Sequence, residues 1–231
     1  MGEGEAPLFR LELRLGPRDI ELLTRRDLRE LLLFAQRGQL WAKMKRIVEE
    51  GERAIYHAVF VAFVVGKERA AREADIDYWA LEDNDMPALK KTQEDYMRDF
   101  RALMAEVQRD VLLGKIGERV KHYIWRSELI AQQAVWRAYN RGKLALWDDE
   151  ILHRRAEEQR YKYRGKFMFK TAADDRVCRL CGPMSGRMAD DPFEFPEPPL
   201  HVNCRCEIVA VPTVRLATKQ QRFARRFLEE G

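Results

Sequence analysis

Residues 174–206 contain all four cysteines of the protein and read DDRVCRLCGPMSGRMADDPFEFPEPPLHVNCRC. A C-x-x-C pair comes first, and an H-x-x-C-x-C cluster follows about twenty residues later. Two short clusters of sulfur and imidazole donors, joined by a loop rich in proline and glycine, are typical of a tetrahedral Zn²⁺ site. Each turn directs donors at one ion, with zinc–sulfur bonds of about 2.3 Å. The five candidate ligands are Cys178, Cys181, His201, Cys204 and Cys206.

Five donors compete for four coordination positions, so one of them is expected to stay outside the metal's ligand shell. We predict Cys178, Cys181 and His201 as ligands, together with either Cys204 or Cys206. His201 and Cys204 have the spacing of a turn, whereas Cys204 and Cys206 would share one face of a strand. The spacing leaves this choice open.

Two other interpretations of the cysteines also stay open. The cysteines could form two disulfides, or they could be buried thiols that pack as small apolar groups. A disulfide framework fits poorly, because the chain is long, has only these cysteines and opens with no secretory signal. The metal site is therefore the favoured interpretation.

A structural site is favoured over a catalytic one. A catalytic zinc keeps one position open for water, and its chemistry needs a general base beside that water. The pattern marks no such base. A metal-dependent hydrolase of nucleic acid or peptide is nevertheless kept as an alternative, because four carboxylates lie near the donors in sequence. They are Asp190, Asp191, Glu194 and Glu207.

Composition places the chain among mostly helical soluble proteins, with 35% charged and 46% hydrophobic residues in a length of 231. Its 42 basic residues are nearly matched by 38 acidic ones, so the net charge of +4 is no sign of nucleic-acid binding by itself. The most apolar run, Ala58–Val65, is far shorter than the roughly 20 residues that cross a membrane. We expect a protein made and kept in the cytosol, or in a particle assembled there.

Apolar residues recur at helical intervals through most of the first 160 positions. The pattern predicts four helices, over about 17–37, 40–74, 89–113 and 118–141. The acidic segment 75–87 is expected to be a loop. A charged helix should run from Trp147 to about Arg160, with Gly142 capping or bending the helix before it. The second helix is apolar on nearly all sides around Val59–Val65, so it must be buried against several neighbours, in this chain or in another.

Three stretches read as strands, over 9–15, 161–171 and 206–211, and Gly165 suggests a bulge or turn in the second. The loop 182–200 contains too many prolines to be helical and needs an external clamp to hold its shape. A metal would supply the clamp, because structural zinc contributes on the order of 10 kcal/mol of folding free energy in small domains. The tail is expected to form a short basic helix.

These features predict a mainly α protein with a small β and loop module, α+β in class. An N-terminal helical bundle would be followed by a metal-clamped knuckle. Four segments are expected: an N-terminal strand and helical arm (1–87), a helical core (88–160), a zinc-knuckle-like module (161–214) and a basic C-terminal helix (215–231).

Basic and aromatic residues alternate over 161–170. Such interleaving can form a platform on which the bases of single-stranded nucleic acid stack. A strand with one charged face, leading into the metal knuckle, is the favoured interpretation. The basic residues that could meet DNA are Lys162, Arg164, Lys166, Lys170, Arg205, Arg222, Arg225 and Arg226.

The cysteine region also carries a longer pattern. Thr171 opens a T-x-x-D-x-x-x-C-x-x-C run, which leads through a proline-rich loop into LHVNCRC at 200–206. Upstream stand IWRSE at 124–128 and AYNRG at 138–142. Together they resemble the signature of the Mu F-like phage head morphogenesis family, the minor head proteins of tailed phages. The resemblance covers about 120–212.

Two departures from the family pattern are visible. Ser127 stands where threonine is common, and Val202 replaces the usual proline of L-H-P-N-C-R-C. Neither change removes a metal donor, but without the proline the turn before Cys204 is expected to be less rigid.

The resemblance implies a virion component made in few copies, assembled in the host cytoplasm and packaged in the capsid interior near the portal. It implies a role in head assembly and in DNA packaging or delivery, and no catalytic activity. The expected partners are the portal protein, the major capsid protein or both. Contact with packaged DNA and an oligomer within the virion are further expectations, and no membrane is involved. The apolar run Val59–Val65 is the reason in the residues themselves for expecting a protein partner.

Overall fold

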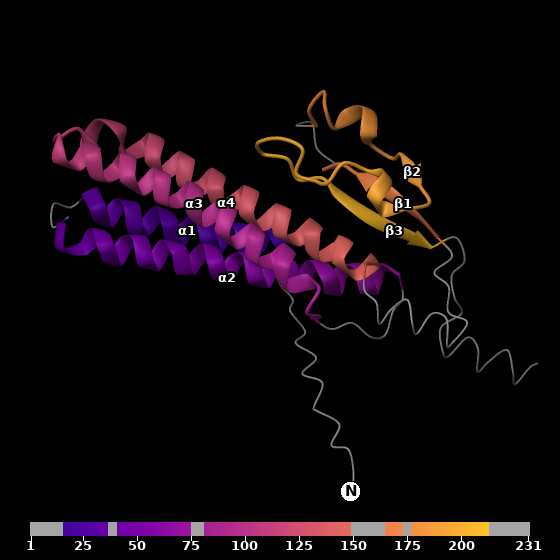
Figure 1. The fold of residues 1–231 in the computed structure, drawn as a ribbon. Coiled ribbons are helices and arrows are strands. Elements are labelled where there is room, and N and C mark those ends of the chain that lie inside the picture. The colour runs from indigo at the N-terminus through magenta and orange to yellow at the C-terminus, as the bar shows by residue number, and fades with distance from the viewer. Residues whose placement is uncertain (1–15, 37–40, 75–80, 149–164, 173–176, 213–231) are drawn as a thin grey trace, which may run out of the picture.

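The structure is a computed structural model, and it describes residues 16–36, 41–74, 81–148, 165–172 and 177–212. Four long helices lie side by side in an elongated bundle, and a small sheet lies against one end of it (Figure 1). The helices are α1 (Pro17–Gln36), α2 (Trp41–Glu73), α3 (Asp85–Leu112) and α4 (Ile116–Trp147). The prediction of a mainly α protein with a small β and loop module is confirmed.

One hydrophobic core joins the four helices. Its fully buried side chains come from every helix and include Leu28, Val59, Phe63, Phe100, Leu103, Tyr123 and Val135. The apolar segment around Val59 is therefore buried, as predicted, and its neighbours belong to this chain. Phe60 is the large side chain of that segment that stays 38% exposed. The segment consequently gives little reason to expect a protein partner.

Two glycines let α2 and α4 approach each other closely. A Cβ atom on Gly66 would lie 2.0 Å from the carbonyl oxygen of Tyr139, and one on Gly142 would lie 1.9 Å from that of Phe63. The two contacts are reciprocal and involve backbone atoms, which cannot rotate away. The expectation that Gly142 caps its helix is wrong, because α4 continues through it to Trp147. The glycine serves packing between helices.

Replacing Gly142 with alanine is expected to lower the free energy of unfolding by at least 1–3 kcal/mol, the usual range for overpacked cores. Urea unfolding followed by circular dichroism measures this change. Gly117→Ala is the matched control, since Gly117 is also in α4 but a Cβ there meets nothing within 4 Å. The control should be neutral or slightly stabilising. Equal effects of the two substitutions would contradict the close approach of α2 and α4.

Two predicted helix boundaries need correction. α3 begins at Asp85, so Pro87 lies in its first turn, where a missing N–H costs nothing, and does not end a loop. Asp85 is buried and accepts hydrogen bonds from Lys67 Nζ at 2.6 Å and from the Glu82 amide at 2.8 Å. Trp147 ends α4 and does not open a new helix. The rest of that predicted helix, 149–160, lies outside the described residues.

The sheet is antiparallel with strand order β2-β1-β3. Its strands are β1 (Gly165–Lys170), β2 (Met188–Ala189) and β3 (Glu207–Pro212). Gly165 is the first described residue of β1 and pairs with Pro212, and the pairing with β3 is continuous from there to Lys170. The residues before Gly165 lie outside the described part, so the expected bulge or turn there stays a prediction. The loop 182–200 is also more regular than predicted, because it holds β2 and two short 3-10 helices, η1 (Gly182–Met184) and η2 (Pro192–Glu194).

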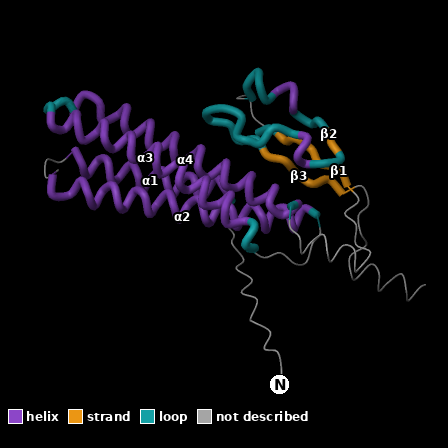
Figure 2. The backbone as a smooth tube through the Cα atoms, viewed as in Figure 1, coloured by secondary structure: helices purple, strands orange, loops and turns teal. Residues whose placement is uncertain are grey.

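The sheet module has its own small core and packs on the C-terminal half of α4 (Figure 2). Phe167, Phe169, Phe195 and Ile208 are buried in it, and three of the cysteines join them. Trp147 of α4 meets Phe167 edge to face, with ring centroids 4.8 Å apart. The helix bundle therefore provides the platform on which the cysteine region is assembled.

Several predictions fall outside the described residues: the strand 9–15, the first part of the strand 161–171 and the helix of the C-terminal tail. The four segment boundaries stay predictions. None of the described helices is both long and apolar enough to cross a membrane.

Candidate metal centre

Two similar turns present the donors. In the first, the Gly182 amide donates to the Cys178 carbonyl at 2.8 Å and closes the turn that holds Cys178 and Cys181. In the second, the Cys204 amide donates to the His201 carbonyl at 3.1 Å. Asn203 has φ 63°, a left-handed conformation that asparagine tolerates better than most residues. The left-handed asparagine and this hydrogen bond shape the turn although Val202 replaces the proline.

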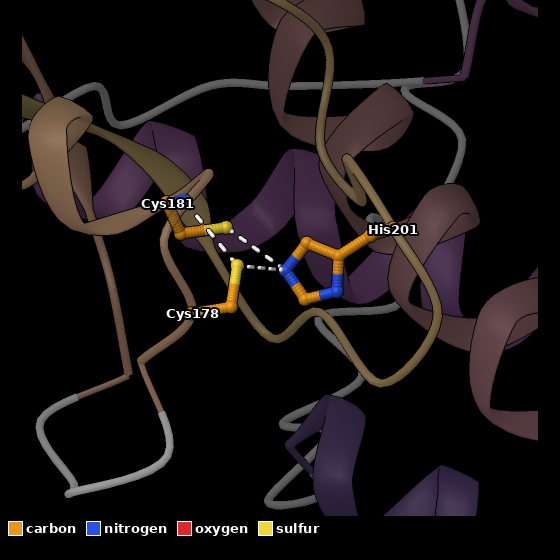
Figure 3. A group of neighbouring side chains, drawn as sticks. All are labelled: Cys178, Cys181 and His201. Atoms are coloured by element: carbon orange, nitrogen blue, oxygen red, sulfur yellow. Dashed lines mark hydrogen bonds between the residues drawn. The ribbon is translucent and has the colours of Figure 1, made fainter.

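The five predicted donors lie together. Cys178 and Cys181 point at the imidazole of His201, with their sulfurs 2.9 and 3.1 Å from its Nε2 (Figure 3). The Cys181 sulfur lies 3.7 Å from the Cys204 sulfur. Two groups have all their donor atoms within 4.8 Å of one another: Cys178 with Cys181 and His201, and Cys181 with Cys204 and Cys206. Cys181 belongs to both groups. All four cysteines are free thiols, so the alternative of two disulfides is wrong.

The His201 ring is set in the tautomer that a metal ligand needs. Its Nδ1 lies 2.6 Å from the Val202 carbonyl oxygen, a group that only accepts hydrogen bonds. Nδ1 therefore carries the proton and donates it, which leaves the lone pair of Nε2 facing the two sulfurs. A backbone carbonyl that fixes the second ring nitrogen is a usual companion of a metal-bound histidine.

The thiols differ in how readily they lose a proton. Two backbone amides, those of Cys181 and Leu180, point at the Cys178 sulfur and hold its pKa below the ordinary value. Burial raises the pKa of Cys181 to about 12. A hydrogen bond from Cys206 lowers the pKa of Cys204 to about 5, and the same bond raises that of Cys206. A cation would displace the protons from the sulfurs it binds, so metal uptake here should release protons.

The donor set fits zinc. Three or four thiolates with one imidazole are soft and borderline ligands, which favour Zn²⁺ over Mg²⁺ or Ca²⁺. Within the described residues, neither donor group contains a carboxylate. The ion would be held by residues from both ends of the proline-rich loop. Its chemistry would be that of a cross-link.

The four carboxylates considered for a hydrolase have other contacts. Asp190 is exposed and pairs with Lys166 at 3.5 Å. Asp191 and Glu194 form a capping box on η2: the Asp191 carboxylate accepts a hydrogen bond from the Phe193 amide, and the Glu194 carboxylate accepts one from the Asp191 amide. Glu207 accepts hydrogen bonds from Tyr139, Lys143 and Lys170. Each of these carboxylates therefore makes a structural contact elsewhere. None of them belongs to either donor group of the described residues, where a general base would have to lie.

Polar side chains of α4 hold the second turn through hydrogen bonds to backbone carbonyls in and beside it. Gln133 donates to the His201 carbonyl at 3.3 Å, and Arg137 donates to that of Pro199 at 3.4 Å. Asn140 is buried and donates to the Cys206 carbonyl at 3.0 Å. These residues follow each other at intervals of four and three, so they share one face of the helix. Loss of the Asn140 amide would leave a buried carbonyl unpaired, at a cost of about 1–3 kcal/mol.

A buried ionic cluster lies beside this contact and ties the module to two helices. Lys143 of α4, with only 2% of its side chain exposed, lies 2.9 Å from Glu73 of α2 and 3.0 Å from Glu207 of β3. Tyr139 donates to the same Glu207 carboxylate at 3.1 Å. Desolvation and the neighbouring carboxylates raise the pKa of Tyr139, so its hydroxyl stays a donor.

Sequence reasoning missed this supporting layer. Asn140 was quoted only as part of a family pattern, A-x-N-x-G, and Gly142 was otherwise expected to cap or bend its helix. The structure gives each a physical role: Asn140 holds the Cys206 carbonyl, and Gly142 admits the Phe63 backbone. The spacing of the polar residues along one face of α4 is visible in the sequence and could have indicated these contacts.

The described candidates for DNA contact are engaged within the chain. Lys166 pairs with Asp190, and Lys170 lies 3.0 Å from Glu207. Arg205 also has an interaction within the chain. The remaining candidates lie outside the described residues: Lys162, Arg164, Arg222, Arg225 and Arg226.

Fold and site together define the class of the protein, a helical bundle that carries a compact Cys/His module suited to a structural metal ion. The family model described as Phage Mu protein F like protein matches residues 99–209, so this part of the chain is similar to that family. The match begins in α3 and ends in β3, so it includes α4 and all five donors. It starts earlier than the resemblance expected from about residue 120. Searches of curated proteins and of solved structures gave no match.

Proposed function

We propose that this chain is a minor head protein of a tailed phage, a structural and assembly component of the capsid interior near the portal. Its part would be to assist head assembly and DNA packaging or delivery. The observation that carries the proposal is the family match over residues 99–209, which contains the whole candidate metal centre. The chemistry of that centre supports a structural role, because soft donors from two turns form two groups that share Cys181, and neither group contains a carboxylate within the described residues.

In this proposal the zinc-clamped module presents a loop surface, and the bundle provides a second surface for the portal or the major capsid protein. Large apolar side chains more than half exposed support the second surface. Leu112 and Leu113 lie at the turn between α3 and α4, at the end of the bundle away from the sheet (Figure 1), and Trp125 lies further along α4. Exposed apolar side chains that gather on one surface commonly mark protein interaction sites.

A direct role in binding DNA receives less support. Lys166 and Lys170 are paired with carboxylates, and phosphate binding would have to compete with those pairs. The protein partner is therefore the interaction that we propose first.

Cross-linking mass spectrometry on assembled heads tests the proposal. We expect the chain in purified heads, in few copies, with cross-links from the α3–α4 end to the portal or capsid protein. Leu113→Glu should weaken this association. Leu180→Glu changes a similarly exposed leucine of the module, so a comparison of the two variants tells whether the bundle surface or the module surface binds the partner. A chain that is absent from heads and does not associate with either protein would refute the proposal.

A further inference from the structure

The second turn and the start of β3 offer two cysteines for one coordination position. We infer that Cys178, Cys181, His201 and Cys204 bind the metal ion, and that Cys206 is a positioning residue whose thiol hydrogen-bonds to the Cys204 sulfur. The inference rests on the metal-clamped module of the proposed function and specifies its ligands.

The distance between the Cys181 and Cys204 sulfurs fits two ligands of one ion. With zinc–sulfur bonds of about 2.3 Å, two sulfurs of a tetrahedral site lie about 3.8 Å apart. The Cys181 and Cys204 sulfurs are 3.7 Å apart, and the His201 nitrogen already contacts both sulfurs of the first turn. These contacts connect the four donors in an unbroken series, Cys178 to His201 to Cys181 to Cys204.

The two turns also match each other. Cys178-x-x-Cys181 and His201-x-x-Cys204 have the same spacing, and each is closed by a backbone hydrogen bond. Backbone amides donate to the sulfur of one cysteine in each turn: those of Leu180 and Cys181 to Cys178, and those of Leu200 and Cys206 to Cys204. Amide donors stabilise a thiolate, the form of cysteine that binds metal. The two turns therefore hold the Cys178 and Cys204 sulfurs in the same way, with backbone amides pointing at them.

Cys206 is fixed by contacts outside the two turns. Its carbonyl is fixed by Asn140, and the next residue, Glu207, begins β3 and is held by Lys143. Side chains alternate along a strand, so Cys206 shares the inner face with Ile208 and Ala210, and all three are buried in the module's core. From this fixed place the Cys206 thiol reaches the sulfurs of Cys181 and Cys204 and donates a hydrogen bond to each. A sulfur held in this way resembles a small core side chain that orients a ligand.

Titration of the full-length protein with Co²⁺ tests the assignment. The near-ultraviolet thiolate-to-cobalt band grows with the number of bound thiolates, and the visible bands report tetrahedral geometry. We expect one Co²⁺ per chain with three thiolates. Cys206→Ala should keep the stoichiometry and the band intensity, with affinity reduced by no more than about 10–100-fold, as for residues that orient a ligand. Cys204→Ala should lose about a third of the intensity, since two of three thiolates remain.

The outcomes separate this inference from the proposed function. If Cys206→Ala loses the third of the intensity and Cys204→Ala does not, the assignment is overturned while the metal clamp stands. Two Co²⁺ ions per chain, or a four-thiolate spectrum, would also overturn it. If the unmodified protein takes up no Co²⁺ at all, the metal clamp of the proposed function fails as well. A variant that fails to fold is recognised by its circular dichroism, and Cys206→Ser and Cys204→Ser then repeat the comparison.

Discussion

Cys181→Ser is expected to abolish zinc binding and to unfold the sheet module while the helix bundle remains folded. Cys181 belongs to both groups of close donors, so the site loses its central sulfur whichever of the last two cysteines binds. Serine keeps the size of the side chain but provides a poor ligand for zinc. The loss is on the order of 10 kcal/mol of folding free energy, which is comparable with the whole stability of a typical domain.

The bundle should survive because its core is separate from that of the module. Phe63, Phe100 and Tyr123 belong to the bundle core, whereas Phe169 and the cysteines belong to the module's. Hydrogen exchange measures the two parts in one experiment: amides of residues 177–212 should lose protection, and those of α2 and α4 should keep it. Leu180→Ser is the matched control, since it changes an exposed residue of the same turn. Protected module amides in Cys181→Ser would contradict the clamp.

Removal of the Lys143 charge should have the second largest effect. Lys143→Met leaves Glu73 and Glu207 facing each other without the cation between them. Breaking a buried ion pair in this way costs 3–5 kcal/mol, and we expect about 3 because both carboxylates retain some exposure. Denaturant unfolding measures the change. Lys170→Met is the control, because it removes a half-exposed partner of the same Glu207 and should cost less than about 1 kcal/mol.

A second substitution tests whether the loss of stability in Lys143→Met comes from the uncompensated carboxylates. Adding Glu207→Gln to Lys143→Met removes one of the two uncompensated carboxylates, so the double variant should be more stable than Lys143→Met alone. Strictly additive losses would argue against the ionic cluster.

Acidification should weaken the same cluster. Burial alone would raise the pKa of Glu207, but the charges and hydrogen bonds of Lys143 and Lys170 outweigh it and hold the pKa below 4.5. A carboxyl whose pKa is lower in the folded state stabilises the fold above its unfolded pKa, and this stability is lost as the pH falls through the folded value. The stability difference between the wild type and Glu207→Gln should therefore shrink below about pH 4.5.

The donors could be predicted from the sequence because their chemistry is local. Two short spacings, C-x-x-C and H-x-x-C-x-C, bring each cluster together whatever the rest of the chain does. The helices were also predictable from the period of their apolar residues. Pro87 shows the limit of such reasoning, since a proline that ends a loop and one that opens a helix look alike until the neighbouring turn is known.

The supporting contacts could not be predicted, because they join residues far apart in the chain. Asn140 and Cys206 are 66 positions apart, and Glu73 and Lys143 are 70 apart. Gly142 was misinterpreted for the same reason: a glycine that ends a helix and one that admits a neighbouring backbone differ only in tertiary structure. The capping box of Asp191 and Glu194 was different, because its spacing was visible in the sequence and could have predicted η2.

Elemental analysis of the full-length protein, purified without added metal, tests the central claim most directly. The clamp requires one zinc ion per chain in the unmodified protein and none in Cys181→Ser, with Leu180→Ser equal to the unmodified protein. Folded, protected module amides in a protein that contains no metal would contradict it.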